Sequence, residues 1–238
     1  MKGSVCILLF TLLFAVPIAQ AQVSVGAKVG GSLTSFRFHY DNSEIRQDPQ
    51  LLPRFTFGLI LNWQLNDLLA FQPQVLYSGK GAGFNVDSFY WALEDVDAKG
   101  SSQRSINYLE VPVNVVLSFG EPAKGQFQVF AGPYIAYALS GIGRDDWEAT
   151  YTIPGTNERR TDKVEERTTL RFGSENSDHY RKLDYGLNVG VGFRISLIQA
   201  QVGYGLGLAN LFSSDQLRED ARVSNSAIHA SLALLLGR

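Results

Sequence analysis

His229 and Ser231 are the residues whose types and spacing come closest to a catalytic pair. Side chains two positions apart on a strand share a face, and a histidine beside a hydroxyl can act as its general base if a carboxylate orients it. Apolar residues occupy the alternate positions, Ile228, Ala230 and Leu232. The pair therefore lies on the polar face of its strand, away from the face where a lipid substrate would lie, and we expect no catalytic residue here.

A run of alternating glycines, Gly203, Gly205 and Gly207, superficially resembles a nucleotide-binding loop. Such a loop follows a strand and opens a helix, because the helix N-terminus holds the phosphate. Here the glycines alternate with Tyr204 and Leu206 inside a strand-like segment. They are expected to make room for side chains opposite them, and no cofactor is predicted.

Acidic residues and a histidine in the connecting segments, Asp145, Asp146, Asp178, His179 and Asp215, invite comparison with the omptin proteases. Omptins use acidic pairs and a histidine at the rim of a barrel, whereas loop carboxylates are ordinarily only solvated. No grouping of histidine, cysteine and carboxylates has the spacing of a metal site. We therefore expect neither proteolysis nor a bound metal.

The elements that carry these residues show strict alternation of apolar and polar side chains. Phe57, Leu59 and Leu61 fall on one face of their segment, a period of two that predicts a strand with one apolar face. The pattern recurs in eight segments: 23–36, 54–65, 69–78, 106–119, 126–139, 183–195, 199–211 and 226–236. The connections between them are alternately short and long. This predicts an all-β fold, an eight-stranded antiparallel up-and-down transmembrane β-barrel.

The N-terminal segment, residues 1–21, has the order of a cleavable export signal: a positive charge, an apolar run and Ala19-Gln20-Ala21. We expect cleavage before Gln22, and a barrel domain over residues 22–238 with four long extracellular loops. The predicted location is the outer membrane of a Gram-negative-type cell, with outer-membrane lipid around the barrel. The only cysteine, Cys6, lies in the signal, and the net charge of −2 argues against a nucleic-acid partner.

Few charged or titratable side chains fall on the inward face of the strands. They are Lys28, Arg54, Glu110, Asp184, Arg194 and His229. An isolated charge in so narrow an interior costs on the order of several kcal/mol, so these groups should be paired or hydrated. Lys28 is the expected partner of Glu110, with Arg194 at the short-turn mouth. We predict a structural polar network of Lys28, Glu110, Arg194 and His229, and a proton or ion path is the alternative.

The third long connection, residues 141–182, holds 17 charged residues. Segments 150–153 and 168–172 within it are rich in β-formers, and a turn-forming Pro-Gly-Thr-Asn follows the first of them. They predict a raised hairpin in which the two segments pair. The candidate contact residues are Tyr151 and Phe172 here, and Phe89, Tyr90 and Trp91 in the long connection 79–105.

A family resemblance rests on residues 26–31 (GAKVGG), 108–113 (YLEVPV), 130–134 (FAGPY) and 184–192 (DYGLNVGVG). These segments resemble those of the PorT-like family of small outer-membrane β-barrel proteins. The resemblance implies a small outer-membrane barrel, and the namesake of the family serves a protein-secretion apparatus. The chain departs from such barrels at its end, Leu236-Gly237-Arg238, where an aromatic residue is common.

Three functions follow as hypotheses. The first is a non-enzymatic surface protein whose extracellular loops, mainly residues 140–182, bind a partner protein or a surface glycan. The second is an accessory subunit of an outer-membrane protein secretion or assembly complex, with other envelope proteins as partners. The third, a barrel enzyme that hydrolyses lipid or peptide, lacks a site.

Overall fold

The computed structural model describes residues 22–39, 49–87, 96–121, 124–153, 156, 158–173, 180–212 and 222–237. The expected signal segment and the contact candidates Phe89, Tyr90 and Trp91 lie outside these residues. Within the described ranges, no helix has the length and apolar character needed to span a membrane.

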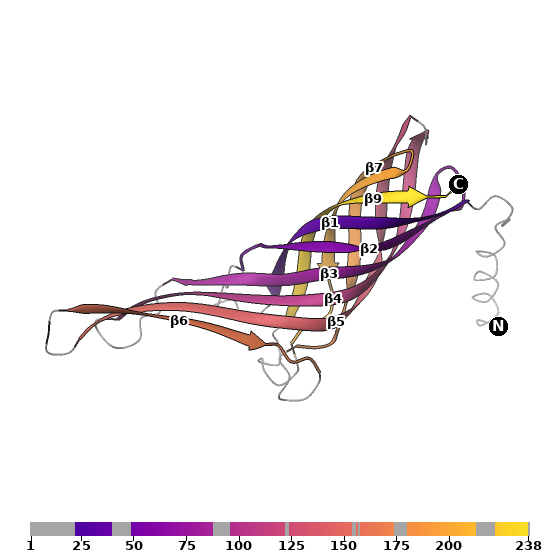
Figure 1. Ribbon diagram of the computed structural model, residues 1–238. Coiled ribbons are helices and arrows are strands. Elements are labelled where there is room, and N and C mark those ends of the chain that lie inside the picture. Colours follow the sequence, from indigo (N-terminus) through magenta and orange to yellow (C-terminus); the bar gives the residue numbers. More distant parts are fainter. Residues whose placement is uncertain are drawn as a thin grey trace, which may run out of the picture.

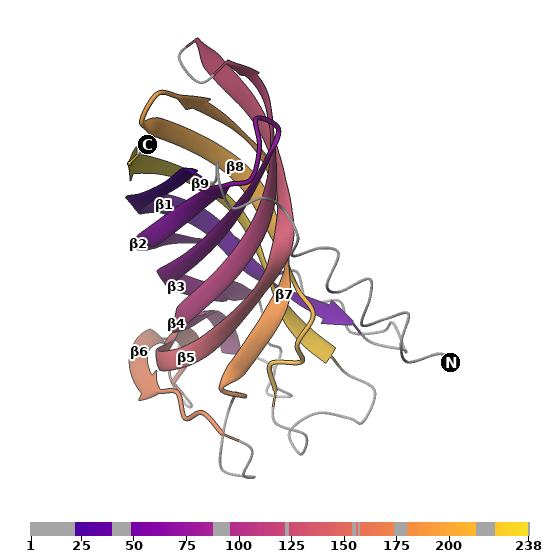
Figure 2. The same cartoon turned by 90° about the vertical axis from the view of Figure 1, so that its right-hand side faces the viewer.

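Most of the described residues lie in strands. They are β1 (Gln22–His39), β2 (Leu52–Gln64), β3 (Leu69–Asp87), β4 (Val96–Glu121), β5 (Gly125–Thr152), β6 (Arg159–Thr169), β7 (Leu183–Ile195), β8 (Ile198–Gly207) and β9 (Arg222–Leu236). All pairings are antiparallel, in the order β4-β3-β2-β1-β9-β8-β7-β5-β6, and an additional β4–β5 pairing closes the ring. The ring contains every strand except β6, which pairs only with the far part of β5 (Figures 1 and 2). The predicted eight-stranded up-and-down barrel is confirmed.

The two faces of the barrel wall differ as the alternation predicts. In β2, Leu59 is 62% exposed and its neighbour Ile60 is 1% exposed. The same contrast runs around the ring, where large apolar side chains such as Val113, Val191 and Leu232 point outward. An apolar belt of this kind is unfavourable in water and is matched by the hydrocarbon of a membrane.

The strands are longer than predicted at the end of the barrel that carries the long connections, here called the long-loop end. β3 continues to Asp87, β4 begins at Val96 and β5 continues to Thr152, so much of the predicted loops is strand. The hydrophobic pattern fails there because both faces of these extensions carry polar residues. β8 conversely ends at Gly207, short of the predicted residue 211.

A β-bulge lies where β5 leaves the barrel. Tyr108 pairs with Ala138 and Asn107 with Ser140, so Leu139 has no partner on β4. Such an insertion changes which residues face inward. Buried positions in β5 are even-numbered up to Ala138 and odd-numbered from Gly141, so the inner face of the barrel continues into the extension.

The raised hairpin exists as β5 and β6, but its predicted register is wrong. Thr150 pairs with Thr161, and Thr168 pairs with Gly143. The turn sets this register, since Ile153 N donates to Glu158 O at 2.9 Å and the partners follow outward from that bond. A turn that tight places residues 168–172 back at the rim of the barrel.

The interior of the barrel is packed. A side chain added at Gly190 would come within 2.5 Å of the Phe130 ring, and one at Gly186 within 2.7 Å of the Tyr134 ring. Of the alternating glycines, Gly203 likewise makes room for Phe130 and His229, as predicted, whereas Gly207 lies against the backbone of Asn225. At the long-loop end an aromatic and aliphatic cluster, here called the rim cluster, fills the lumen. Its buried members are Phe36, Ala82, Ile106, Tyr108, Tyr134, Ala136, Ala138, Leu170, Tyr180, Leu211 and Val223.

Candidate functional site

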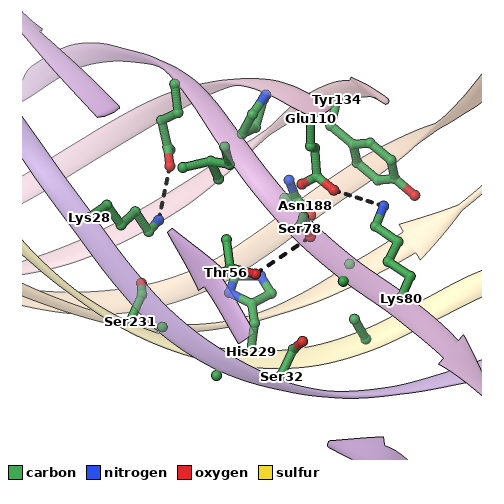
Figure 3. A pocket seen from close by; sticks show the side chains of 18 of the residues that line it. Lys28, Ser32, Thr56, Ser78, Lys80, Glu110, Tyr134, Asn188, His229 and Ser231 are labelled. Carbon is green, nitrogen blue, oxygen red and sulfur yellow. Dashed lines mark hydrogen bonds and ion pairs between the residues drawn. The ribbon is translucent and has the colours of Figure 1, made fainter. Parts of the chain in front are cut away.

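The centre of the polar interior is Lys80, a residue that the sequence placed in a loop. Its Nζ lies 2.8 Å from Glu110 Oε2 (Figure 3). The same Nζ lies 3.0 Å from Asp184 Oδ2. It also lies over the Tyr134 ring, 3.9 Å from the centroid. The expectation that Lys28 pairs with Glu110 is wrong, because β3 extends beyond Gly79 and brings Lys80 inward beside this carboxylate.

Asp184 is fully buried and joins four strands. Besides Lys80, it accepts hydrogen bonds from Asn225 Nδ2 at 2.9 Å and from the Tyr134 hydroxyl at 3.3 Å. The sequence predicted it as an inward charge that should be paired or hydrated. Its burial means that its charge is offset by Lys80 and by these donors rather than by water.

Lys28 belongs to a separate group of amide side chains. It donates to Gln74 Oε1 and to Gln201 Oε1, each at 3.0 Å. Gln201 in turn donates to Gln72, which is bonded to Gln199 from the opposite side of the barrel. This ladder of amides crosses the interior and leaves little open space.

The remaining members of the predicted polar network are not joined to it. Arg194 donates to Ser196 O at 3.2 Å at the short-turn end. His229 packs on Phe130 with ring centroids 6.3 Å apart, and Figure 3 shows it in the same chamber as Ser231. Among the described residues no hydrogen bond joins His229 to Ser231, whose buried hydroxyl has no partner. The pair lacks both contacts that a nucleophile and its base require.

A small polar chamber lies between Lys28 and Lys80, with a volume of about 60 Å³. Asn188, Asn114 and His229 line it with the two lysines. The volume is enough for a few water molecules, and the lining supplies their hydrogen-bond partners. In the described part of the chain no cluster of three or more His, Cys, Asp or Glu side chains could hold a metal ion.

The exposed polar feature of the molecule is an antiparallel sheet that continues the barrel wall beyond the long-loop end (Figure 1). We call it the extended sheet and define it as residues 82–87 of β3, 96–105 of β4, 141–152 of β5 and 159–169 of β6. Backbone pairing is continuous across all four segments. It is therefore an ordered surface rather than a set of separate loops.

Side-chain contacts tie its strands together. Asp145 accepts hydrogen bonds from Ser102 at 2.6 Å and from Arg104 at 2.9 Å. Burial alone would raise the pKa of the Asp145 carboxyl, but these two donors outweigh it and hold the pKa below its ordinary value. Lys163 pairs with Glu148 at 3.0 Å.

Tyr151 and Phe172 differ in what they can contact. The Tyr151 hydroxyl donates to Asp162 Oδ2 at 2.8 Å, which lowers the pKa of that carboxyl and places Tyr151 on the extended sheet. Phe172 instead packs on Tyr180 at the rim cluster, with ring centroids 6.4 Å apart. Phe172 therefore contributes to closing the barrel.

Sequence reasoning missed the apolar pair on the extended sheet. Trp147 and Val164 are directly opposite each other, 39% and 57% exposed. The Trp147 ring lies over Gly100, where an added side chain would overlap it. An isolated tryptophan in a charged loop was the available signal, but only the register shows that it faces a valine.

A closed antiparallel ring with an apolar outer belt and a filled polar interior defines a small barrel of an outer membrane. The chain belongs to the family described as outer membrane protein beta-barrel domain, whose model matches residues 18–213. The protein is accordingly an outer-membrane protein.

Several solved barrels are similar to this chain at low identity. Ail, the attachment invasion locus protein of Yersinia pestis, is 13% identical over 90% of this chain and 99% of its own, with a TM-score of 0.31. Neisserial surface protein A is 11% identical over 87% of this chain and 96% of its own, with a TM-score of 0.31. The outer membrane protease OmpT from Escherichia coli is 10% identical over 93% of this chain and 100% of its own, with a TM-score of 0.40. No curated protein sequence matches.

Proposed function

We propose that this protein is a non-enzymatic outer-membrane barrel whose long-loop end faces the exterior and binds a partner protein or a surface glycan, mainly through residues 140–182. The observation that carries the proposal is the extended sheet, in which β5 and β6 continue as paired strands beyond the barrel. Ordering a hairpin of that length costs conformational entropy, and a short loop would be enough to connect β5 and β7. The ordered hairpin therefore supports a role beyond connecting the two strands.

The chemistry of the extended sheet supports recognition rather than catalysis. It presents an exposed apolar pair, Trp147 and Val164, beside charged residues such as Lys163 and Glu165. Apolar centres within charged surroundings are typical of protein contact surfaces. His229 and Ser231, the best candidates for hydrolysis, lie inside the barrel without a catalytic hydrogen bond.

The alternative is an accessory role in an outer-membrane secretion or assembly complex. It is favoured by the resemblance of residues 108–113, 130–134 and 184–192 to the PorT-like family. In that case the partner is another envelope protein, and the same surface would hold it.

Deletion of the hairpin tests the proposal. Residues 145–181 are replaced by a short glycine-containing turn, and the barrel should still fold because the ring strands keep their closed hydrogen-bond network. Binding to a glycan array and co-purification of envelope proteins from gently solubilised membranes are then compared with those of the intact protein. A matched control shortens the connection between β8 and β9.

The expected result is loss of binding in the hairpin deletion and its retention in the control. A stoichiometric set of envelope proteins with the intact chain would favour the accessory role. Full binding after the hairpin deletion would refute the assignment to residues 140–182.

A further inference from the structure

β6 is an open edge of the sheet. It is the last strand in the order and, in the described part of the chain, pairs only with β5. Its ladder can be assigned from its two ends, since Ile153 N donates to Glu158 O and Leu170 N donates to Gly141 O. Bonded pairs alternate along an antiparallel ladder. Even-numbered residues of β6 therefore bond to β5, and odd-numbered residues point their N–H and C=O groups outward.

The outward-pointing backbone groups form what we call the free edge. They belong to Arg159, Thr161, Lys163, Glu165, Arg167 and Thr169. An unpaired edge of this length is a template for another strand. Its centre is apolar, because Val164 is the only apolar residue of β6 and lies beside Trp147.

The charge pattern of β6 is self-complementary. We propose that the free edge pairs antiparallel with the free edge of a second copy of this chain, with the two-fold axis at Val164. Lys163 then faces Glu165 of the second copy, and Glu165 faces its Lys163. The two Val164 side chains meet on the axis, each flanked by Trp147 of its own chain. The inference rests on the proposed function, because it requires the long-loop end to be exposed outside the cell.

The register is selective. Only the odd-numbered residues of β6 point their backbone groups outward, so each of them must face an odd-numbered residue of the second copy. This is possible only if the two-fold axis passes through a residue and not between two residues. A two-fold at any of the four neighbouring positions, Asp162, Lys163, Glu165 or Glu166, sets two like charges face to face, which is destabilising. Val164 is also the midpoint of the 11-residue strand, so this register overlaps the whole of β6.

One pairing in this register is unfavourable, Asp162 opposite Glu166 of the second copy. Asp162 is already held by the Tyr151 hydroxyl at 2.8 Å and by Arg160 Nε at 3.1 Å. Arg160 also lies on the same face as Asp162, diagonal to that Glu166, and offsets its charge. The favourable pairs at the centre therefore decide the register.

The symmetry places the two barrels in opposing membranes. The two-fold axis that relates two antiparallel strands can be perpendicular to their sheet. A line perpendicular to the wall of a barrel points along the barrel radius and therefore lies in the plane of the membrane. Figure 1 shows β3, β4 and β5 running from the barrel into the extended sheet, and their pairing is continuous, so we take the extended sheet as a continuation of the wall. Rotation about such an axis inverts the barrel. The second copy belongs to a facing membrane, and many such weak pairs act together as adhesion.

Vesicle tethering tests the proposal. The full chain is placed in vesicles of phosphatidylethanolamine and phosphatidylglycerol that carry one of two dyes, and two-colour coincidence is measured. Vesicles with the natural protein should tether to each other. Lys163→Glu vesicles among themselves, and Glu165→Lys vesicles among themselves, should lose tethering by about tenfold or more, since each lost pair is repeated over many contacts.

Mixing the two variants provides the decisive comparison. Lys163→Glu presents two acidic residues and Glu165→Lys presents two basic ones, so vesicles of the first should tether to vesicles of the second. The double variant Lys163→Glu/Glu165→Lys should tether to itself and not to the natural protein. Recovery in the mixture also shows that each variant still folds its hairpin.

Absence of tethering by the natural protein, or failure of the mixed variants to recover it, overturns this inference. If either occurs while the hairpin deletion still abolishes binding of another partner, the self-pairing of β6 falls and the proposed function stands. If the deletion changes no binding at all, both fall.

Discussion

At the scale of single residues, Lys80 determines the electrostatics of the barrel interior. It is 6% exposed and ion-paired to two carboxylates, Glu110 of the neighbouring strand β4 and Asp184 of β7. Lys28 is equally buried, but its partners are neutral amides. The two lysines thus have the same charge and burial, but Lys80 neutralises two carboxylates whereas Lys28 only donates hydrogen bonds to neutral amides.

Replacement of Lys80 by methionine should lower the free energy of unfolding by about 3–5 kcal/mol, because it leaves two buried carboxylates without a cation. Lys28→Met is the matched control and should cost about 1–2 kcal/mol, since it leaves only amide oxygens unpaired. Urea unfolding in lipid vesicles measures both. Adding Glu110→Gln and Asp184→Asn to Lys80→Met should recover most of the loss, and equal effects of the two lysines would contradict this account.

At the scale of elements, the membrane strands were predictable and their extensions were not. β7 runs over residues 183–195 as predicted, because lipid outside and a filled interior impose a period of two. Beyond the rim both faces meet water, so β6 reads as a charged loop although it is a strand. Lys80 was assigned to a loop for another reason: it lies between Gly79 and Gly81, where the apolar alternation of its strand stops, so its ion pair with Glu110 was missed.

The lipid-facing side of the strands allows a direct test. Leu59→Arg, Val113→Arg or Val191→Arg should each destabilise the folded barrel by about 2–4 kcal/mol, since each puts a charge into hydrocarbon. Leu59→Phe keeps the surface apolar and should cost less than about 1 kcal/mol. Unfolding in vesicles distinguishes the two, and an Arg variant as stable as the Phe variant would refute the outward facing of β2.

The extended sheet should loosen in acid. The pKa of the Asp145 carboxyl lies below its ordinary value, so its bonds to Arg104 and Ser102 stabilise the sheet above about pH 4 and are lost as the pH falls through the lowered value. In a variant with Trp63 and Trp91 changed to phenylalanine, the fluorescence emission comes from Trp147. This emission should stay constant from neutral pH to about pH 4 and change below it. Asp145→Asn should weaken this acid transition; an unchanged transition would assign it to Asp162 instead.

At the scale of the whole molecule, the lumen of the barrel is packed with side chains and the extended sheet continues from its wall. A ring of eight strands leaves room only for side chains. Phe130 and Tyr134 of β5 fill that room beside glycines of the neighbouring strand β7, Lys80 of β3 reaches Asp184 of β7 across it, and the rim cluster fills the long-loop end.

The barrel should therefore give no stable conductance steps in planar bilayers. Phe130→Ala should also remain silent, because Tyr134 and the amide ladder around Gln72 still block the lumen above and below it. A truncation that removes the rim residues of β9 and the connection before it serves as the comparison, since it opens only one end. Reproducible conductance steps from the natural protein would mean that ions cross a larger assembly or a rearranged lumen. A proton or ion path that includes Lys28 and Glu110 would then explain the buried charges better than a structural network does.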